Sequence, residues 1–467
     1  MNAQVLCIIL SAGISLAAND PGVSSPGLQS NAGLSVSQST NVAGCDSLPP
    51  STAATGVSSG SVATKQDAPT LSEVMAELKR IQDENKVLGK QLSALSVPGS
   101  SSLKVGVLAQ MQGQVLQEQT SAVQDTTRAY TQHWQRQLFV RRLRALFGGE
   151  LSKSTSFFVE SDATNIGKVD AAGSKPTKVS MYIQDAYIQH TFMPELSMIA
   201  GLQLVGISRN SLQSAASLMA LDYGAYQFLT STPLDNTAGR DLGLNLRGFL
   251  FDERLEYRAG VFSGKNVNLY TPMRTVVRLN YMLEDREKGF FYSGTTLGKG
   301  KVLSFGGGVD LQSSFRSYSF DAFADLPVVK SGSLTASASW TYLDGGGSEQ
   351  DSTFFTGAIP RQSILFFEAG YFLRDLGIQP YLKFETDMVN ADVLRQVNAT
   401  PATLDFQNKV RSKERFGLGL NYFLNGHGAS VKVLYEFATR WRSSLTPGLA
   451  ESVTTGEATI QFQYFVF

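Results

Sequence analysis

From residue 101 onward, apolar and polar residues alternate with a period of two over segments of about 9–13 residues. Residues 254–261 place Leu, Tyr, Ala and Val on one face and Arg, Glu, Arg and Gly on the other, and residues 365–373 keep an apolar face on the odd-numbered positions. Globular strands commonly have ~5–6 residues, whereas a tilted strand that crosses a bilayer needs ~9–11. The pattern therefore predicts an all-β transmembrane protein.

Sixteen alternating segments can be counted along this part of the chain. They begin near residues 103, 136, 151, 180, 195, 240, 253, 273, 300, 315, 332, 362, 376, 411, 428 and 453. An even number of strands returns the chain to the side where it began, as closed bacterial barrels require. We expect short turns near Gly148–Gly149, Pro194, Asp252, Arg374–Asp375 and Asn425–His427, alternating with long connections. Two places depart from this rule, because the turn near 285–299 is long and the connection near 313–315 is short. The prediction is a 16-stranded antiparallel outer-membrane β-barrel over residues 101–467.

Composition separates this interpretation from others. The chain holds 43 Gly, is 10% aromatic and only 17% charged, and its mean hydropathy is −0.07. Beyond residue 18 no apolar run approaches the ~18 residues of a spanning helix, which excludes a helical bundle. A soluble sandwich or propeller is the alternative, since alternation does not say which face meets water. An export signal, the strand length and Phe467 favour the membrane, because a terminal aromatic residue resembles the signal read by the outer-membrane assembly machinery.

The N-terminal region predicts export followed by an unstructured segment. Residues 5–18 are uncharged, apolar and end in small residues, as in a signal peptide over residues 1–18, although no Lys or Arg precedes them. A short buried helix is the alternative. Residues 19–70 are rich in Ser, Gly, Ala, Thr and Pro, so they cannot bury enough surface to offset the entropy of ordering. We expect a disordered linker there.

Residues 71–97 have the heptad spacing of a coiled coil. The a positions hold Leu71, Leu78, Asn85 and Leu92, and the d positions hold Val74, Ile81, Leu88 and Leu95. Leu at a with Ile or Leu at d favours three or more strands, and a polar a position fixes register at some cost in stability. Pro98 and Gly99 end the segment. It predicts an oligomerisation stalk in the periplasm; a lone amphipathic helix packed on the barrel is the alternative.

Several stretches of residues 101–467 resemble the phosphate-selective porin O and P family. They are residues 139–144 with 149–153, residues 239–243 with 255–264, residues 378–381 and residues 417–427. The resemblance covers about four fifths of the chain. It implies a sixteen-stranded trimeric outer-membrane channel for small solutes, and a homotrimer agrees with the heptad pattern.

Charge does not by itself predict phosphate selectivity. Residues 1–101 hold five Lys or Arg and seven Asp or Glu, which leaves 35 and 33 for the barrel. Clustered Arg or Lys at a constriction would be needed to trap phosphate. The candidates for lining the pore or binding anions are Arg142, Arg144, Arg209, Arg247, Arg254, Arg258 and Arg278. Glu256, Glu368 and Glu385 are expected to share the lumen with them. We favour the interpretation that these arginines form the transverse charge screen of a general porin.

The connection at 206–239 is too apolar for a loop in water. It carries Arg209, a helix-like stretch from Leu212 to Leu221, and the aromatic residues Tyr223, Tyr226 and Phe228. Folding into the lumen as a constriction is one interpretation, and packing against a neighbouring protomer is the other.

Other functions have weaker support in the sequence. Net charge is zero, so nothing indicates nucleic acid as a partner, and no C-x-x-C-H motif or metal cluster predicts a cofactor. The one G-x-S-x-G match, at residues 56–60, lies in the Ser- and Gly-rich segment, and none of the three His lies in a motif with a nucleophile, so we do not expect an enzyme. The alternative to a porin is a non-conducting anchor or sheath whose coiled coil holds a periplasmic partner, either peptidoglycan or an electron-transfer cytochrome.

Overall fold

The computed structural model describes residue 80 and residues 102–119, 132–169, 174–176, 179–226, 239–264, 270–344, 361–389, 412–441 and 452–467. The predicted signal peptide (1–18), the linker (19–70) and, apart from Arg80, the coiled coil (71–97) lie outside these residues. Among the described residues, no helix has the length and apolar character needed to cross a membrane.

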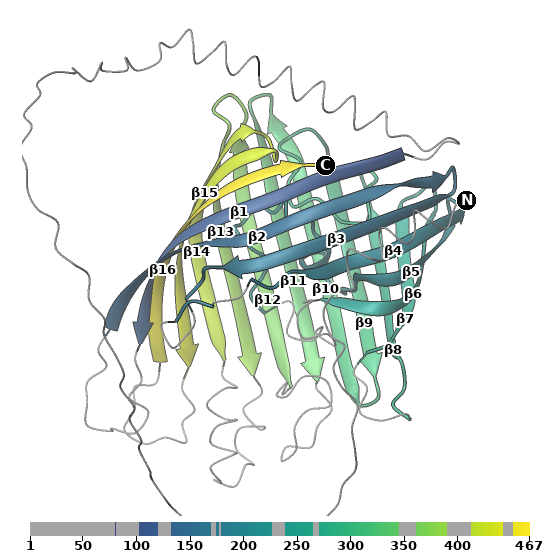
Figure 1. Ribbon diagram of the computed structural model, residues 1–467, viewed down its shortest axis with the longest axis horizontal. Helices are drawn as coiled ribbons and strands as arrows, with labels where there is room; N and C mark the ends of the chain where they lie inside the picture. The colour runs from purple at the N-terminus through teal and green to yellow at the C-terminus, as the bar shows by residue number, and fades with distance from the viewer. Residues whose placement is uncertain are drawn as a thin grey trace, which may run out of the picture. The chain divides into compact units, whose positions relative to one another are not determined.

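The described strands form one closed antiparallel barrel in which each strand pairs with its neighbours in sequence and β1 closes on β16 (Figure 1). The first eight are β1 (Ser102–Gln119), β2 (Gln132–Ser152), β3 (Thr155–Ile166), β4 (Tyr182–Met193), β5 (Leu196–Leu204), β6 (Arg240–Leu250), β7 (Leu255–Phe262) and β8 (Arg274–Met282). The others are β9 (Val302–Gln312), β10 (Phe315–Val329), β11 (Gly332–Asp344), β12 (Gln362–Leu373), β13 (Ile378–Val389), β14 (Lys413–Asn425), β15 (Ala429–Trp441) and β16 (Ser452–Val466). The sixteen-stranded architecture predicted from alternation is confirmed.

Predicted and observed strand starts agree closely, but one predicted turn is wrong. Gly148 and Gly149 lie inside β2, and the chain reverses at Lys153–Ser154 instead. A Cβ on Gly149 would lie 1.8 Å from the carbonyl oxygen of Ser102 on β1, and one on Gly148 would lie 2.9 Å from the Phe467 ring. These glycines permit close approach between neighbouring segments, and the sequence alone does not distinguish that use from a turn.

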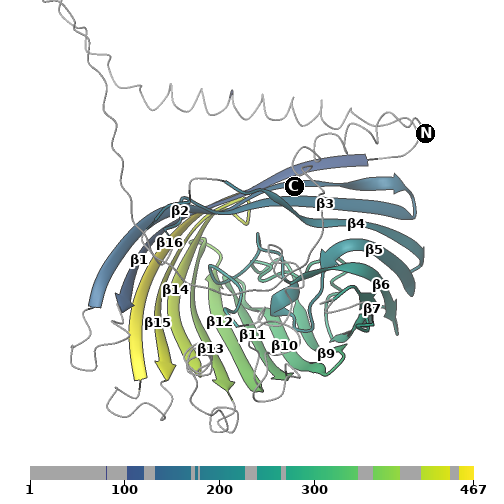
Figure 2. The same cartoon turned by 60° about the horizontal axis from the view of Figure 1, so that its bottom comes forward.

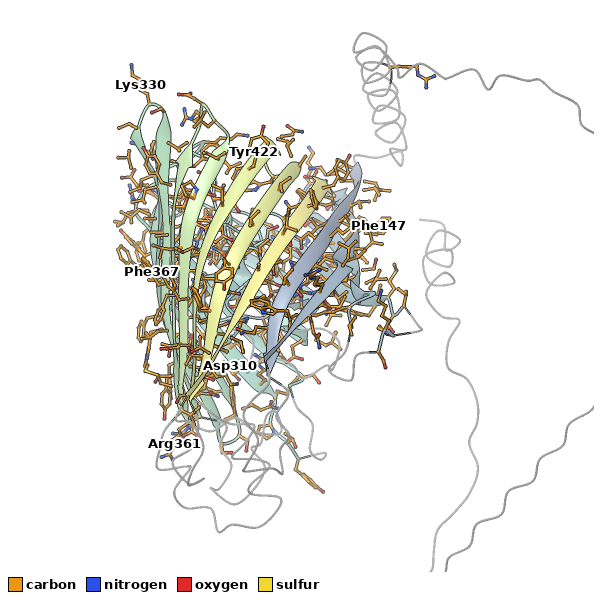
Figure 3. The ribbon with its side chains drawn as sticks, turned by 90° about the vertical axis from the view of Figure 1, so that its left-hand side faces the viewer. Phe147, Asp310, Lys330, Arg361, Phe367 and Tyr422 are labelled. Carbon is orange, nitrogen blue, oxygen red and sulfur yellow. The ribbon has the colours of Figure 1, made fainter. Side chains whose placement is uncertain are left out.

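Side chains alternate between the outer wall and the lumen along the strands. On β12, residues 362, 364, 366, 368, 370 and 372 are buried, whereas Leu365 and Phe367 are exposed on the outside. Phe367 and Tyr422 lie on the outer wall between Lys330 at the end with short turns and Arg361 at the end with long loops (Figure 3). A wall with so many exposed Leu, Val, Phe and Tyr side chains suits acyl chains rather than water.

Two connections enter the barrel from opposite ends. Residues 205–226 follow β5 at the end with long loops, and we call them the loop insert; residues 283–301 join β8 to β9 at the other end, and we call them the turn insert. The loop insert lies inside the ring of strands (Figure 2), and Leu212 and Met219 are almost fully buried. For the described residues 205–226, folding into the lumen, one of the two interpretations of this connection, is therefore confirmed.

The loop insert is not the helix that its sequence suggested. Only Asn210–Leu212 form a helical turn, of the 3-10 type, and the rest up to Tyr226 is irregular. The carbonyl groups that a helix would use internally are turned outward to the barrel wall, where side chains donate to them. Burial against the wall thus outweighs the local helical preference.

The two inserts bind each other through their backbones. Tyr292 N–H donates to the carbonyl of Leu212 at 3.0 Å, and Ser214 N–H donates to the carbonyl of Tyr292 at 2.9 Å. Gly294 N–H donates to Ser217 Oγ at 3.1 Å. The inserts therefore form one packed unit within the described part of the lumen.

Candidate functional site

Side chains from a run of neighbouring strands anchor the loop insert by its backbone carbonyls. On β1 and β16, Gln110 donates to Ala215 at 3.3 Å and Gln463 to Ala216 at 2.8 Å. The next three strands continue the series. Lys432 on β15 donates to Leu218, Asn421 on β14 to Met219 at 2.8 Å, and Lys383 on β13 to Tyr223 at 3.1 Å. We call these five side chains the donor belt; because buried carbonyls must be satisfied, the belt fixes the path of the insert.

A carboxylate on β13 completes this attachment. Glu385 accepts hydrogen bonds from the backbone N–H groups of Ala225 at 2.7 Å and Tyr226 at 2.8 Å. Glu385 is fully buried, so these two bonds compensate for its burial. The lumen position expected for this residue is confirmed, and it acts there as an anchor.

The turn insert is held by arginines from the barrel wall. Glu256 on β7 pairs with Arg247 at 2.6 Å and Arg258 at 2.8 Å, and it accepts a hydrogen bond from the Tyr292 hydroxyl at 2.6 Å. Arg247 also donates to the carbonyl of Gly289 at 2.7 Å, and Arg258 to that of Phe290 at 2.8 Å. These charges are paired and almost fully buried, so they hold the insert and do not face solution.

Arg209 joins the two inserts. Its guanidinium binds both carboxylate oxygens of Glu287, at 2.6 and 2.8 Å, and lies 3.7 Å from the centre of the Phe323 ring. Arg278 on β8 donates to the carbonyl of Ile207 at 2.6 Å and pairs with Asp321. Both arginines stabilise the packed unit.

A cavity of about 660 Å³ lies between the loop insert and strands β1–β4, β6 and β13–β16. Its lining includes seven cationic side chains, Arg141, Arg142, Arg144, Lys168, Arg240, Lys383 and Arg415. Four carboxylates line it as well, Asp162, Asp222, Glu436 and Glu457. Cations therefore outnumber carboxylates among the lining residues, while Arg144 and Arg240 also pair with Glu160 and Asp185 behind the lining. Low-dielectric walls strengthen the field of the charges that line such a cavity.

A β-bulge on β2 brings two consecutive arginines to this cavity. Gln110 pairs with Arg142, but the next residue, Met111, pairs with Val140, so Arg141 is the extra residue. Strict alternation would send Arg141 to the outer wall; a bulge redirects the side chain. Arg141 donates to Asp222 at 2.9 and 2.6 Å, and Arg142 donates to the other oxygen of the same carboxylate.

Asp222, in the loop insert, is ionised in this setting. Burial alone would raise the pKa of its carboxyl group, but Arg141 and Arg142 together hold that pKa well below its usual range. About a third of its side chain (33%) remains exposed. The carboxylate is therefore both tightly paired and open to the cavity.

The structure divides the predicted arginines into three groups. Arg142 and Arg144 line the cavity, and Arg144 pairs with Asp162 at 2.7 Å. The second group comprises Arg209, Arg247, Arg258 and Arg278, which bind the inserts. Arg254 lies in the turn between β6 and β7, where it donates to the carbonyl of Leu283 at 2.6 Å and reaches neither the cavity nor the other arginines.

Five cationic residues of the cavity were not predicted from the sequence. Arg141 is hidden by the bulge, and Arg240 and Arg415 lie near strand ends where alternation is short. Lys383 follows the regular alternation of β13, so its position in the sequence does not set it apart from other lumen residues. Its hydrogen bond to the loop insert shows its role. Lys168 follows β3 and lies over the Phe139 ring at 5.1 Å.

An apolar cluster lies on strands β10–β12 against the loop insert. Phe315 and Ile364 are fully buried and form an apolar cluster with Tyr226 and Leu343. Ser317 and Thr335 on the same wall are fully buried as well. Among the described residues, no group of three or more His, Cys, Asp or Glu side chains is placed to hold a metal ion.

Comparison with known proteins gives distant structural likenesses and no family. No protein-family model matches the chain, and no curated protein matches it. The outer membrane channel DcaP of Acinetobacter baumannii is 11% identical, with a TM-score of 0.47, over 79% of this chain and 99% of that one. An anion-selective porin from Comamonas acidovorans is 10% identical, with a TM-score of 0.47, over 79% and 100%. OmpF of Salmonella typhi, in complex with daunomycin, is 11% identical, with a TM-score of 0.47, over 78% and 98%. The likeness is distant, so function has to come from this chain's own residues.

Proposed function

We propose that this chain is a porin of the bacterial outer membrane that passes small solutes by diffusion and prefers anions. The observation that carries the proposal is the cation-rich cavity inside a closed barrel with an apolar outer wall. A solute that enters between the long loops meets this cavity beside the loop insert. Phosphate is one anion that the cavity's Arg and Lys side chains suit, and it agrees with the sequence resemblance to the phosphate-selective porin O and P family.

Reversal potential tests this proposal. Purified protein in planar bilayers under a KCl gradient should give open steps and a reversal potential displaced toward that of chloride. Replacing Lys168 and Arg415 with Gln should reduce the displacement, because both cations line the cavity. The matched control is Lys330→Gln with Arg361→Gln, which removes two cations from opposite ends of the barrel (Figure 3). Cation preference in the unchanged protein would contradict the proposal.

A second candidate has an observation in its favour. The packing of both inserts inside the described lumen suits a non-conducting anchor or sheath with a periplasmic partner. Closed traces from protein that shows folded, heat-modifiable mobility on a gel would favour this candidate over the porin.

We also propose that the chain assembles as a homotrimer through residues 71–97, which would lie in the periplasm. The support is the heptad pattern, with Leu at a and Ile or Leu at d.

A further inference from the structure

Asp222 fills a site that is built to bind an anion. The bulge at Arg141 places two guanidinium groups side by side, and together they donate three hydrogen bonds to the two oxygens of one carboxylate. Guanidinium groups match the planar geometry of a carboxylate, which makes such pairs strong and specific. The ligand of this site is at present part of the chain itself.

Arg142 is held by other residues besides Asp222. Arg142 also donates to Gln110 Oε1 at 2.7 Å, and its guanidinium lies 5.7 Å from the centre of the Tyr223 ring. The side chain of Arg142 is 4% exposed. Its position is therefore set by the wall and does not depend on Asp222 alone.

The insert around Asp222 has attachments of its own. Tyr223 donates through its hydroxyl to the carbonyl of Gln213 at 2.8 Å, and Gly224 N–H donates to Asn210 Oδ1 at 2.8 Å. Lys383 and Glu385 hold the backbone of residues 223–226 from β13. Loss of the Asp222 charge therefore leaves the segment anchored and the arginine pair in place.

We infer that Arg141 and Arg142 form a carboxylate-binding site in the cavity, and that Asp222 is an internal competitor that keeps its affinity for solute carboxylates low. This rests on the proposed function, because a site inside a diffusion channel must release its solute. With Asp222 present, both guanidinium groups are occupied, and a solute carboxylate is attracted only by the remaining cations of the cavity. Without it, two donors whose carboxylate partner among the described residues was Asp222 meet the solute directly.

Equilibrium binding of labelled succinate to the detergent-solubilised full chain tests the inference without requiring conduction. Asp222→Asn should bind succinate at least about tenfold more tightly than the unchanged protein. The variant replaces a charge-assisted hydrogen bond that competes with the solute by a neutral one, and that difference changes the dissociation constant by about tenfold. Glu457→Gln is the matched control, because it also removes one carboxylate from the lining of the cavity. That carboxylate lies 3.7 Å from Arg415 and does not contact the arginine pair.

The outcomes separate the two ideas. Equal gains in Asp222→Asn and Glu457→Gln would overturn the inference, because they would reflect net charge alone, and so would no gain in either. A gain in Asp222→Asn that persists when Arg142 is also changed to Gln would overturn it as well.

Asp222→Ser is a second variant that must reproduce the gain, with folding checked by heat-modifiable mobility. Tight succinate binding by a protein that conducts no current would support the site and refute the porin. Inorganic phosphate binding more tightly than succinate in Asp222→Asn would overturn the carboxylate assignment.

Discussion

Two carboxylates at the end of the barrel with short turns, one buried and one exposed, show how burial changes the value of a single residue. Glu256 bridges Arg247 and Arg258 at 1% exposure, whereas Glu253 pairs with Lys288 on the surface of the same region. A buried carboxylate that neutralises two arginines leaves both uncompensated when it is lost, and a surface pair leaves nothing unsatisfied. The two residues therefore form a natural comparison.

We expect Glu256→Gln to destabilise the barrel by about 3–5 kcal/mol and to loosen the turn insert. Glu253→Gln should cost less than about 1 kcal/mol, because its partner Lys288 stays solvated. Thermal denaturation followed by circular dichroism measures the loss of stability in each variant. Trypsin cleavage after Arg286 or Lys288 measures how far the turn insert is loosened. Equal denaturation temperatures for the two variants would contradict the assigned role of Glu256.

His427 predicts a response of the turn insert to pH. It lies in the turn between β14 and β15, and its Nε2–H donates to the carbonyl of Thr295 at 2.9 Å. Burial, aided by the charges of Lys432 and Lys299 and opposed by the hydrogen bond to Thr295, lowers the pKa of His427 to about 4. The docked state therefore holds the ring neutral, whereas an opened state would bind a proton near pH 6.5.

Docking of Thr295 on His427 should weaken as pH falls from about 6.5 to about 4 and change little above that window. Docking weakens as pH falls because, between pH about 6.5 and about 4, the opened state binds more protons than the docked state. Hydrogen exchange at residues 294–297, corrected for the intrinsic effect of pH, measures it. His427→Asn should remove the pH dependence; if the variant retains it, another group is responsible.

Among the structural elements, the strands could be predicted and the inserts could not. Every strand of the barrel has one face toward lipid and one toward the lumen, so alternation located the starts of all sixteen strands within four residues. The inserts carry no such period, because the partners of Leu218 and Met219 are Lys432 and Asn421, about 200 residues away.

The candidate site was only partly readable for the same reason. Arg142 and Arg144 follow the alternation and were predicted, whereas Arg141 was not, because a bulge depends on the pairing of β2 with β1. Arg247 and Arg258 were placed on the correct face, but the insert that covers them could not be foreseen from their own strands.

Gly294 is a point of close approach between the two inserts. A Cβ there would lie 2.5 Å from the carbonyl oxygen of Ser217 and 2.8 Å from the Cα of Leu218, and neither backbone atom can yield easily. We expect Gly294→Ala to separate the inserts and raise single-channel conductance. Gly300→Ala is the control, because its Cβ would meet only side-chain atoms at 3.3 Å or more. Unchanged conductance in Gly294→Ala would show that the inserts do not limit the current.

At the scale of the whole molecule, one barrel combines an apolar outer wall, two packed inserts in the described lumen and a cavity lined by more cations than carboxylates. The path that we propose for solutes runs through this cavity, beside β1–β4 and β13–β16. A small conductance with a strong influence of cavity charge is the behaviour that this arrangement favours.

Deletion of residues 71–97 should convert the proposed trimer to smaller species while leaving the barrel folded, because the heptad positions lie entirely within that segment. Native gel electrophoresis and light scattering in detergent measure the size. Asn85→Leu is a matched variant, since it keeps the helix and should alter register or strand number instead. A trimer that survives the deletion would assign assembly to the barrel wall.

The donor belt has a consequence for how such a channel can change. Its bonds end on main-chain oxygens, which every amino acid carries, so these hydrogen bonds do not require particular side chains in the insert. Most side chains of residues 215–223 are nevertheless buried in apolar packing, and Asp222 is the partly exposed one that lines the cavity. A substitution of Asp222 can therefore change the charge of the cavity while the backbone attachment of the insert is kept.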